Sequence, residues 1–108
     1  MDDADAVFRA LADASRRQLL DRLHARNGQT LSELCDGLAM TRQAVTKHLA
    51  ILEAANLVAV RWRGREKLHT INPVPIQEIA DRWMSKFDRQ QTRMLAELKA
   101  ALEDEGGS

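Results

Sequence analysis

The chain has 108 residues, a length typical of one domain, and its 16 Lys and Arg residues balance 16 Asp and Glu residues. Its single cysteine excludes an internal disulfide framework, and no apolar run approaches the roughly 18 residues of a membrane span. The first residues, "MDDADAVF", lack the basic-then-apolar order of a secretory signal, so we expect a cytoplasmic protein without a membrane partner.

Two amphipathic helices are predicted at the start of the chain. The first has apolar residues at helical spacing, namely Ala4, Val7, Phe8 and Leu11. The second lies within "DASRRQLLDRLHARNG", where Asp13 or Ser15 is the N-cap and Asn27-Gly28 is the stop. Its expected buried stripe consists of Leu19, Leu20 and Leu23. Arg16 and Arg17 open this helix and are candidates for a phosphate contact or a structural ion pair.

The next two predicted helices are separated by a short turn. Thr30 caps "LSELCDGL", and Glu33 three residues later completes a capping box. Ala39-Met40 forms the expected turn, and Thr41 caps the following helix, which ends at Asn56 in a left-handed conformation. On a helical wheel this helix buries Val45, Leu49 and Leu52, and it presents Gln43, Lys47, Ala50 and Ala54 on the opposite side. This arrangement is a helix-turn-helix.

A two-stranded hairpin follows the helix-turn-helix. The segments "LVAVRWR" and "EKLHTIN" alternate in polarity around Gly64-Arg65, as the strands of a hairpin do. Val58, Val60 and Trp62 share one face of it, whereas Arg61 and Arg63 share the other. The predicted fold is therefore mainly α, a winged helix-turn-helix of about five helices with a β-hairpin wing.

A long last helix is predicted over about residues 73–103, with Asn72 as its cap and Pro73 at its first position. Its apolar stripe runs through Ile76, Ala80, Trp83, Phe87, Gln91, Met94, Leu98 and Leu102. About 30 residues of helix extend about 45 Å, which is longer than a small domain covers by itself. We therefore expect a twofold dimer, with packing on the first helix of the same chain as the alternative. One domain should thus span residues 1–103, with a disordered tail at 104–108.

The balanced net charge conceals a basic middle segment. Residues 37–72 contain six Arg or Lys against two Asp or Glu, whereas each flanking third has a net charge of −2. A local basic surface favours a polyanionic partner, and a helix with Gln and Arg near its N-terminus fits the DNA major groove. The arginines of the hairpin suit phosphate or minor-groove contacts. The alternative for any one of these residues is an ordinary solvated polar face.

Three stretches, "FRALADASRRQLLDRL", "LSELCDGLAMTRQAVTKHLAILEAANLV" and "RWRGREKLHTINP", resemble the ArsR/SmtB family of small bacterial repressors. The most specific pattern consists of Thr41, Val45, Thr46, His48 and Leu49. The resemblance covers about residues 7–75. It implies a homodimer held by the first and last helices, with the fourth helix in the major groove of an operator and the hairpin as the wing.

Two sets of site residues follow from the residues and this resemblance together. The expected DNA-binding residues are Thr41, Arg42, Gln43, Thr46, Lys47, His48, Arg61, Arg63, Arg65 and Lys67. The expected dimerisation residues are Val7, Phe8, Leu11, Ile79, Trp83, Phe87, Met94 and Leu98. For Trp83 and Phe87, ordinary core packing is favoured over the lining of a small-molecule pocket.

The metal-binding motifs of the family are absent from the sequence. Where many members carry a Cys-x-Cys pair at the start of the third helix, this chain reads "QTLSEL", and no histidine occurs from Pro73 to Ser108. A tight zinc site needs three or four Cys, His or carboxylate ligands. We therefore predict no metal and no cofactor, and any inducer is of unknown chemistry. Cys35 is expected to be an inert packing residue, with a redox switch as the alternative.

The sequence thus predicts a sequence-specific DNA-binding transcriptional regulator, a homodimeric repressor acting on a palindromic operator. The alternative is a winged-helix module for protein association with only non-specific DNA affinity. No Gly-rich phosphate loop, nucleophile elbow or clustered carboxylate pair supports catalysis, so we do not expect an enzyme.

Overall fold

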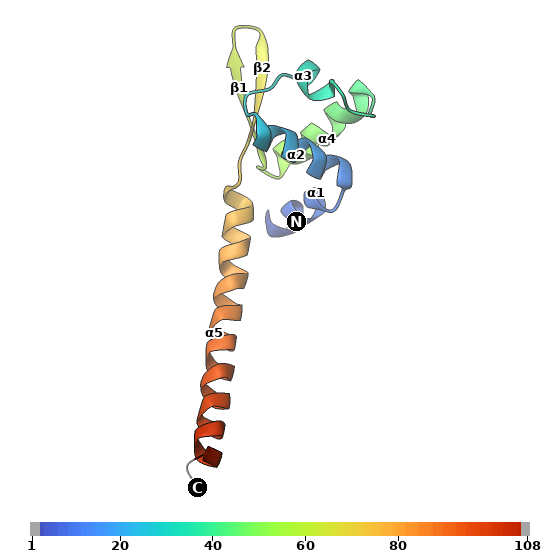
Figure 1. The fold of residues 1–108 in the computed structure, drawn as a ribbon. Coiled ribbons are helices and arrows are strands. Elements are labelled where there is room, and N and C mark those ends of the chain that lie inside the picture. Colours follow the sequence, from blue (N-terminus) through green and yellow to red (C-terminus); the bar gives the residue numbers. More distant parts are fainter. Residues whose placement is uncertain (1–2, 107–108) are drawn as a thin grey trace. The chain divides into compact units, whose positions relative to one another are not determined.

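The computed structural model describes residues 3–106, apart from the side chains at 88 and 105. It comprises two compact units, Met1–Ile76 and Gln77–Ser108. Along the chain the elements are α1 (Asp3–Leu11), α2 (Ala14–Ala25), α3 (Leu31–Cys35), α4 (Arg42–Ala54), β1 (Val58–Arg63), β2 (Glu66–Ile71) and α5 (Val74–Gly106) (Figure 1). This order confirms the predicted fold class, a mainly helical protein of five helices with one antiparallel hairpin.

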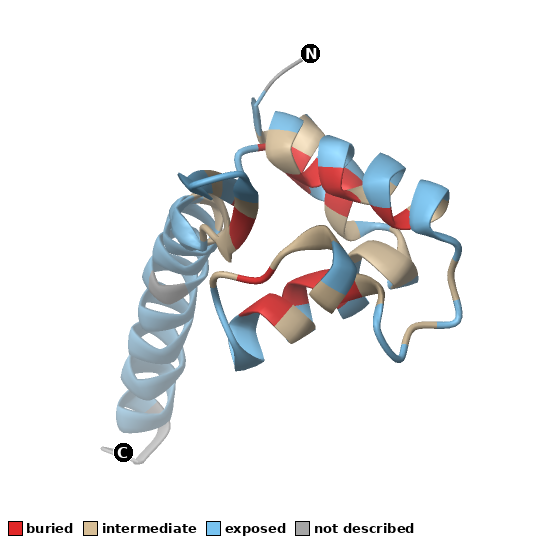
Figure 2. Ribbon diagram, turned by 90° about the horizontal axis from the view of Figure 1, so that it is seen from above, coloured by how far each residue is buried: buried red, intermediate tan, exposed pale blue. Residues whose placement is uncertain are grey.

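The core of the first unit is made by the apolar faces of α1, α2, α3, α4 and the hairpin. Figure 2 shows the buried residues on the sides of the helices that face one another. The fully buried side chains are Leu19, Leu23, Leu34, Val45, Leu52, Leu57 and Leu68. Both predicted stripes, on α2 and on α4, are confirmed. Burying a leucine side chain stabilises a fold by about 1.5–3 kcal/mol, so these residues fix how α4 is presented.

Asp13 is the N-cap of α2, because its Oδ1 accepts hydrogen bonds from the N–H groups of Ser15 at 2.8 Å and Arg16 at 3.2 Å. The two arginines that open α2 bind the C-terminal end of α1. The Arg16 guanidinium donates to the carbonyl oxygens of Ala10 at 2.8 Å and Arg9 at 2.9 Å, and Arg17 donates to that of Leu11. Cations at a helix C-terminus satisfy its free carbonyls and oppose its dipole. Both arginines therefore join α1 to α2.

The helix α3 is shorter than predicted. The capping box is confirmed, since Thr30 Oγ1 accepts from the Glu33 N–H at 3.2 Å and Glu33 Oε1 accepts from the Thr30 N–H at 3.1 Å. However, the helix ends at Cys35, and the connection to α4 runs over residues 36–41. The prediction of a turn of only Ala39-Met40 is wrong. The reason is Gly37, whose φ of +77° is left-handed and ends the helix early.

Glu33 should make the stability of this region depend on pH. Its carboxylate accepts from Arg26 Nη2 at 2.6 Å, and this bond, with those from Thr30, lowers the pKa of Glu33 from 4.5 to about 2. Because the folded pKa is depressed, the stabilisation is present above pH 4.5 and is lost as the pH falls towards 2. Urea unfolding should therefore show a free energy of unfolding that declines through this window. Glu33→Gln and Arg26→Gln should each flatten the decline, and an unchanged slope in both variants would contradict this role.

The helix α4 begins and ends as predicted, and each strand of the wing is one residue shorter than predicted at its outer end. Thr41 Oγ1 accepts from the Ala44 N–H at 3.0 Å, and Asn56 follows the helix with a φ of +60°. The strands pair in antiparallel register from Val58↔Ile71 to Arg63↔Glu66, which leaves Gly64-Arg65 as the two-residue turn. A two-residue hairpin turn fixes the register of both strands. This register determines on which face of the hairpin each wing side chain lies.

The helix α5 begins at Val74, one residue later than predicted, and Asn72 Oδ1 makes a capping contact with the Val74 N–H at 3.3 Å. It continues to Gly106. Residues 104–106, expected in a disordered tail, are therefore helical, and residues 107–108 lie outside the described part. At 1.5 Å per residue, its 33 residues extend about 50 Å. No helix within residues 3–106 is long and apolar enough to cross a membrane.

The apolar stripe of α5 has an 11-residue period rather than a seven-residue one. Ala80, Trp83, Phe87 and Gln91 are followed 11 positions later by Gln91, Met94, Leu98 and Leu102. Such a period is close to that of a straight helix, so the stripe stays on one side along its length. The Trp83 and Phe87 rings lie 6.2 Å apart and are about half exposed. The expectation that these two residues are core is therefore wrong for the single chain.

Candidate nucleic-acid interface

The first two turns of α4 present a continuous polar face. Its exposed residues are Thr41, Arg42, Gln43, Thr46 and Lys47. They are outward because Val45, Leu49 and Leu52 occupy the buried side of the same helix. No acidic residue lies in the first turn of α4. This face can donate hydrogen bonds to base edges and phosphates without repelling a polyanion.

Arg42 is held by a residue that the sequence did not single out. Its Nη1 donates to Ser32 Oγ on α3 at 3.2 Å. Thr46 contacts it as well, because the Thr46 hydroxyl donates to the Arg42 carbonyl at 2.9 Å. The bond to Ser32 orients the Arg42 guanidinium, and the bond to the Arg42 carbonyl orients the Thr46 side chain. A link between α3 and α4 has no local pattern that would reveal it.

His48 lies apart from this polar face. Its side chain is half-buried, and its Nδ1 is 3.4 Å from Arg16 Nη1. Arg16 is in turn bound to the end of α1. The structure thus places His48 in the contact between α4 and the first two helices, and not with the other expected DNA-binding residues of α4.

The four cations of the wing divide into two kinds. Arg63 Nη2 lies 2.7 Å from Glu66 Oε2, a bond that raises the pKa of Arg63, and Lys67 Nζ lies 3.3 Å from Glu53 Oε1 on α4. The other two, Arg61 and Arg65, make no ion pair with any described residue. The hairpin register predicts the Arg63–Glu66 pair, since these residues lie opposite one another. The pairing of Lys67 with α4 is a tertiary contact.

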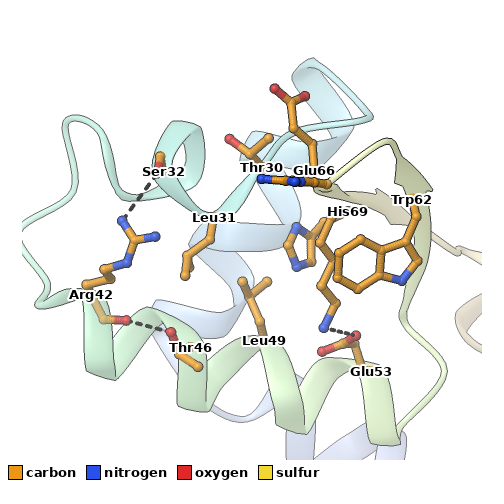
Figure 3. A pocket seen from close by; sticks show the side chains of 12 residues that line it. Thr30, Leu31, Ser32, Arg42, Thr46, Leu49, Glu53, Trp62, Glu66 and His69 are labelled. Carbon is orange, nitrogen blue, oxygen red and sulfur yellow. Dashed lines mark hydrogen bonds and ion pairs between the residues drawn. The ribbon is translucent and has the colours of Figure 1, made fainter.

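A cavity of about 510 Å³ lies between α3, α4 and the wing (Figure 3). It is lined by Thr30, Leu31, Ser32, Arg42, Thr46, Leu49, Glu53, Trp62, Arg65, Glu66, Lys67 and His69. Arg42 and Thr46, which belong to the polar face of α4 (below, the recognition face), form part of its wall. The cavity is therefore continuous with the polar face of α4.

A metal centre is not formed by the side chains that the structure describes, since no three His, Cys, Asp or Glu residues converge. Cys35 is half-buried at the end of α3. His69 is buried, and its Nδ1 lies 2.9 Å from the Gln29 carbonyl oxygen. This histidine joins the wing to the segment before α3.

Known proteins resemble the chain in sequence and in fold. A helix-turn-helix domain family matches residues 11–61. YuzN of Bacillus subtilis (strain 168), an uncharacterised HTH-type transcriptional regulator, is 40% identical over 86 residues, covering 74% of this chain and 94% of YuzN. The HTH-type transcriptional regulator Rv2034 of Mycobacterium tuberculosis is 31% identical over 102 residues, covering 94% of this chain and 91% of Rv2034.

A solved structure extends the likeness to the fold. The ArsR-like transcriptional regulator from Rhodococcus sp. RHA1 superposes with a TM-score of 0.72 at 30% identity, covering 85% of this chain and 89% of that one. Since these similarities span most of each protein, the chain is a DNA-binding transcriptional regulator and not an enzyme. It belongs to the ArsR/SmtB family of winged helix-turn-helix regulators.

Proposed function

We propose that the protein is a homodimeric repressor that inserts the N-terminal turns of α4 into the major groove of its operator. The observation that carries this proposal is the exposed, acid-free face of Arg42, Gln43, Thr46 and Lys47. Gln and Arg form bidentate hydrogen bonds with base edges, and the helix N-terminus attracts phosphate. The Thr41 side chain caps α4, so Thr41 lies at the same helix N-terminus that would contact the phosphate.

In this proposal the wing holds the DNA backbone. Arg61 and Arg65 are exposed and make no ion pair with a side chain that the structure describes, so they are the main phosphate contacts. Arg63 and Lys67 contribute less, because a carboxylate already neutralises each of them. His48 acts indirectly, by holding α4 against Arg16. These contacts position the protein, while α4 reads the bases.

Dimerisation is proposed through the exposed apolar side chains of α5 and α1. Those of the expected set that are about half exposed or more are Phe8, Trp83, Phe87, Met94 and Leu98. Ile79 and Leu11 are half-buried, whereas Val7 is only 3% exposed and packs in the core of its own chain. A continuous stripe of exposed apolar side chains, such as that of α5, marks an interface. Twofold symmetry then requires two half-sites about 10 bp or a multiple of it apart, hence an imperfect palindrome.

Repression follows if the operator overlaps a promoter, since a bound dimer excludes RNA polymerase from the same DNA. The competing function, protein association with only non-specific DNA affinity, has no comparable support, because the first turn of α4 is exposed and free of acids and the wing adds the exposed Arg61 and Arg65. A protein with only this competing function would bind every DNA sequence with a Kd of about 10⁻⁴–10⁻⁶ M at physiological salt.

Two single substitutions separate base reading from backbone binding. Gln43→Ala should cost about 1–3 kcal/mol on the operator and little on unrelated DNA. Arg65→Ala should weaken both DNAs alike and reduce the slope of log K against log salt by about 0.9, the value for one lost phosphate contact on duplex DNA. Salt titrations by fluorescence anisotropy measure both effects. An equal loss on every sequence for Gln43→Ala would exclude its base-reading role.

A further inference from the structure

The cavity between α3, α4 and the wing has a composition that DNA binding does not explain. On the helix side it is lined by the half-buried Leu31 and by Leu49, which is only 3% exposed, and the Trp62 indole, 64% exposed, stands on the wing side (Figure 3). The buried His69 ring lies between them. A phosphate is strongly hydrated and gains nothing from such surfaces. Flat aromatic and aliphatic walls suit a planar apolar group.

The charges around this cavity leave it positive. Of its two acids, Glu53 is paired with Lys67 at 3.3 Å and Glu66 with Arg63 at 2.7 Å. The remaining cations of the lining, Arg42 and Arg65, form no ion pair with any residue in the range 3–106. Among the described side chains, the Arg42 guanidinium donates a hydrogen bond only to the neutral Ser32 hydroxyl. A carboxylate within the cavity would therefore meet a guanidinium free to form a bidentate pair.

We propose that this cavity is an effector site for a planar aromatic carboxylate. The ring packs against Trp62 and Leu31, beside His69, and the carboxylate pairs with Arg42 or Arg65. The cavity volume of about 510 Å³ is within the usual 300–1,000 Å³ of small-molecule sites. Because Arg42 and Thr46 belong to both the cavity and the recognition face, the bound effector and DNA exclude one another. This last consequence rests on the proposed function; binding of the carboxylate itself does not.

The chain provides its own control for a binding experiment. It has two tryptophans, Trp62 in the cavity wall and Trp83 on α5. A ¹H–¹⁵N spectrum thus contains two indole signals, which Trp83→Phe assigns. Titration with 2-naphthoate should shift the Trp62 signal saturably and leave that of Trp83 unchanged. A ligand of this size at ordinary ligand efficiency gives a Kd of about 1 mM or tighter. The cationic isostere 2-naphthylmethylamine should shift neither signal.

Three results would overturn the proposal. The first is that 2-naphthoate causes no saturable shift of the Trp62 signal, and the second is that the amine shifts this signal equally. The third is that inorganic phosphate shifts it equally, which would mean that the cavity binds only DNA phosphate. Arg65→Gln together with Arg42→Gln should weaken 2-naphthoate binding at least about tenfold, as loss of a charge-assisted pair does. Leu49 is left intact, so the core is retained.

Competition with DNA is measured separately. At about ten times its own Kd, 2-naphthoate should raise the apparent Kd for operator DNA about tenfold, as mutually exclusive binding requires. Binding of naphthoate with unchanged DNA affinity would refute the effector role. If the protein binds no DNA specifically, the proposed function fails while the indole titration still decides whether the site exists.

Discussion

Phe87→Asp should separate the proposed dimer into single chains and lower the affinity for an operator at least about 100-fold, because two linked half-site contacts gain 10²–10⁴ in avidity. The Phe87 ring is about half exposed and contacts the Trp83 ring, 6.2 Å away between centroids. Covering the stripe of α5 by a second copy would remove these rings from water. A carboxylate in that interface would be buried without a partner, which is strongly unfavourable. Sedimentation equilibrium measures the molecular mass of the assembly, and fluorescence anisotropy measures its affinity for operator DNA.

Ser85→Asp is the matched control for this substitution. It adds the same charge two positions away, on the opposite side of α5, where residue 85 is exposed. The mass and the DNA affinity should be those of the unaltered protein. A Phe87→Asp variant that keeps the mass of a dimer would show that the stripe of α5 is not the interface.

Leu52→Ala should lower the free energy of unfolding by about 3 kcal/mol, within the range measured for buried leucines. Leu52 is 0% exposed, on the side of α4 opposite to the recognition face. Its truncation leaves a cavity among the leucines that hold α4 against α2 and the hairpin, and the close-packed surroundings relax only in part. For a unit of this size, each kcal/mol corresponds to about 4–8 °C in Tm. Urea unfolding at fixed protein concentration measures the loss.

Ile51→Ala tests whether burial causes this loss. Ile51 is adjacent to Leu52 in sequence and has a side chain of similar volume, but it is 40% exposed. We expect a loss of less than about 1 kcal/mol, since little apolar area leaves the interior. Equal losses at the two positions would mean that helix propensity, and not the core, determines the effect.

Local rules account for most of the fold. Thr30 with Glu33, Thr41 and Asn56 determine helix ends through bonds within three residues, so their roles are readable from sequence. The division of α4 into a buried and a polar face is equally local, because it follows from 3.6-residue periodicity. At the end of α3, one of the places where the prediction failed, the left-handed backbone conformation of Gly37 outweighed an otherwise helical pattern.

The candidate site was predicted only in part, because several of its contacts join residues far apart in sequence. The recognition face of α4 follows from periodicity, whereas the Lys67–Glu53 and Arg42–Ser32 contacts depend on how the wing and α3 pack on α4. The cavity likewise arises from three elements together. Sequence pattern carries no signal for such packing, so it lists Lys67 as a DNA-binding residue without revealing its pairing with Glu53.

The measurement that tests the regulator most directly is fluorescence anisotropy with the DNA upstream of its own gene and a scrambled duplex of equal length. A salt titration of both duplexes separates base reading from phosphate binding. We predict nanomolar affinity for the upstream DNA and a preference of about 10³-fold or more over the scrambled duplex. Weak and equal binding to both duplexes, lost steeply with salt, would contradict specific recognition of this sequence.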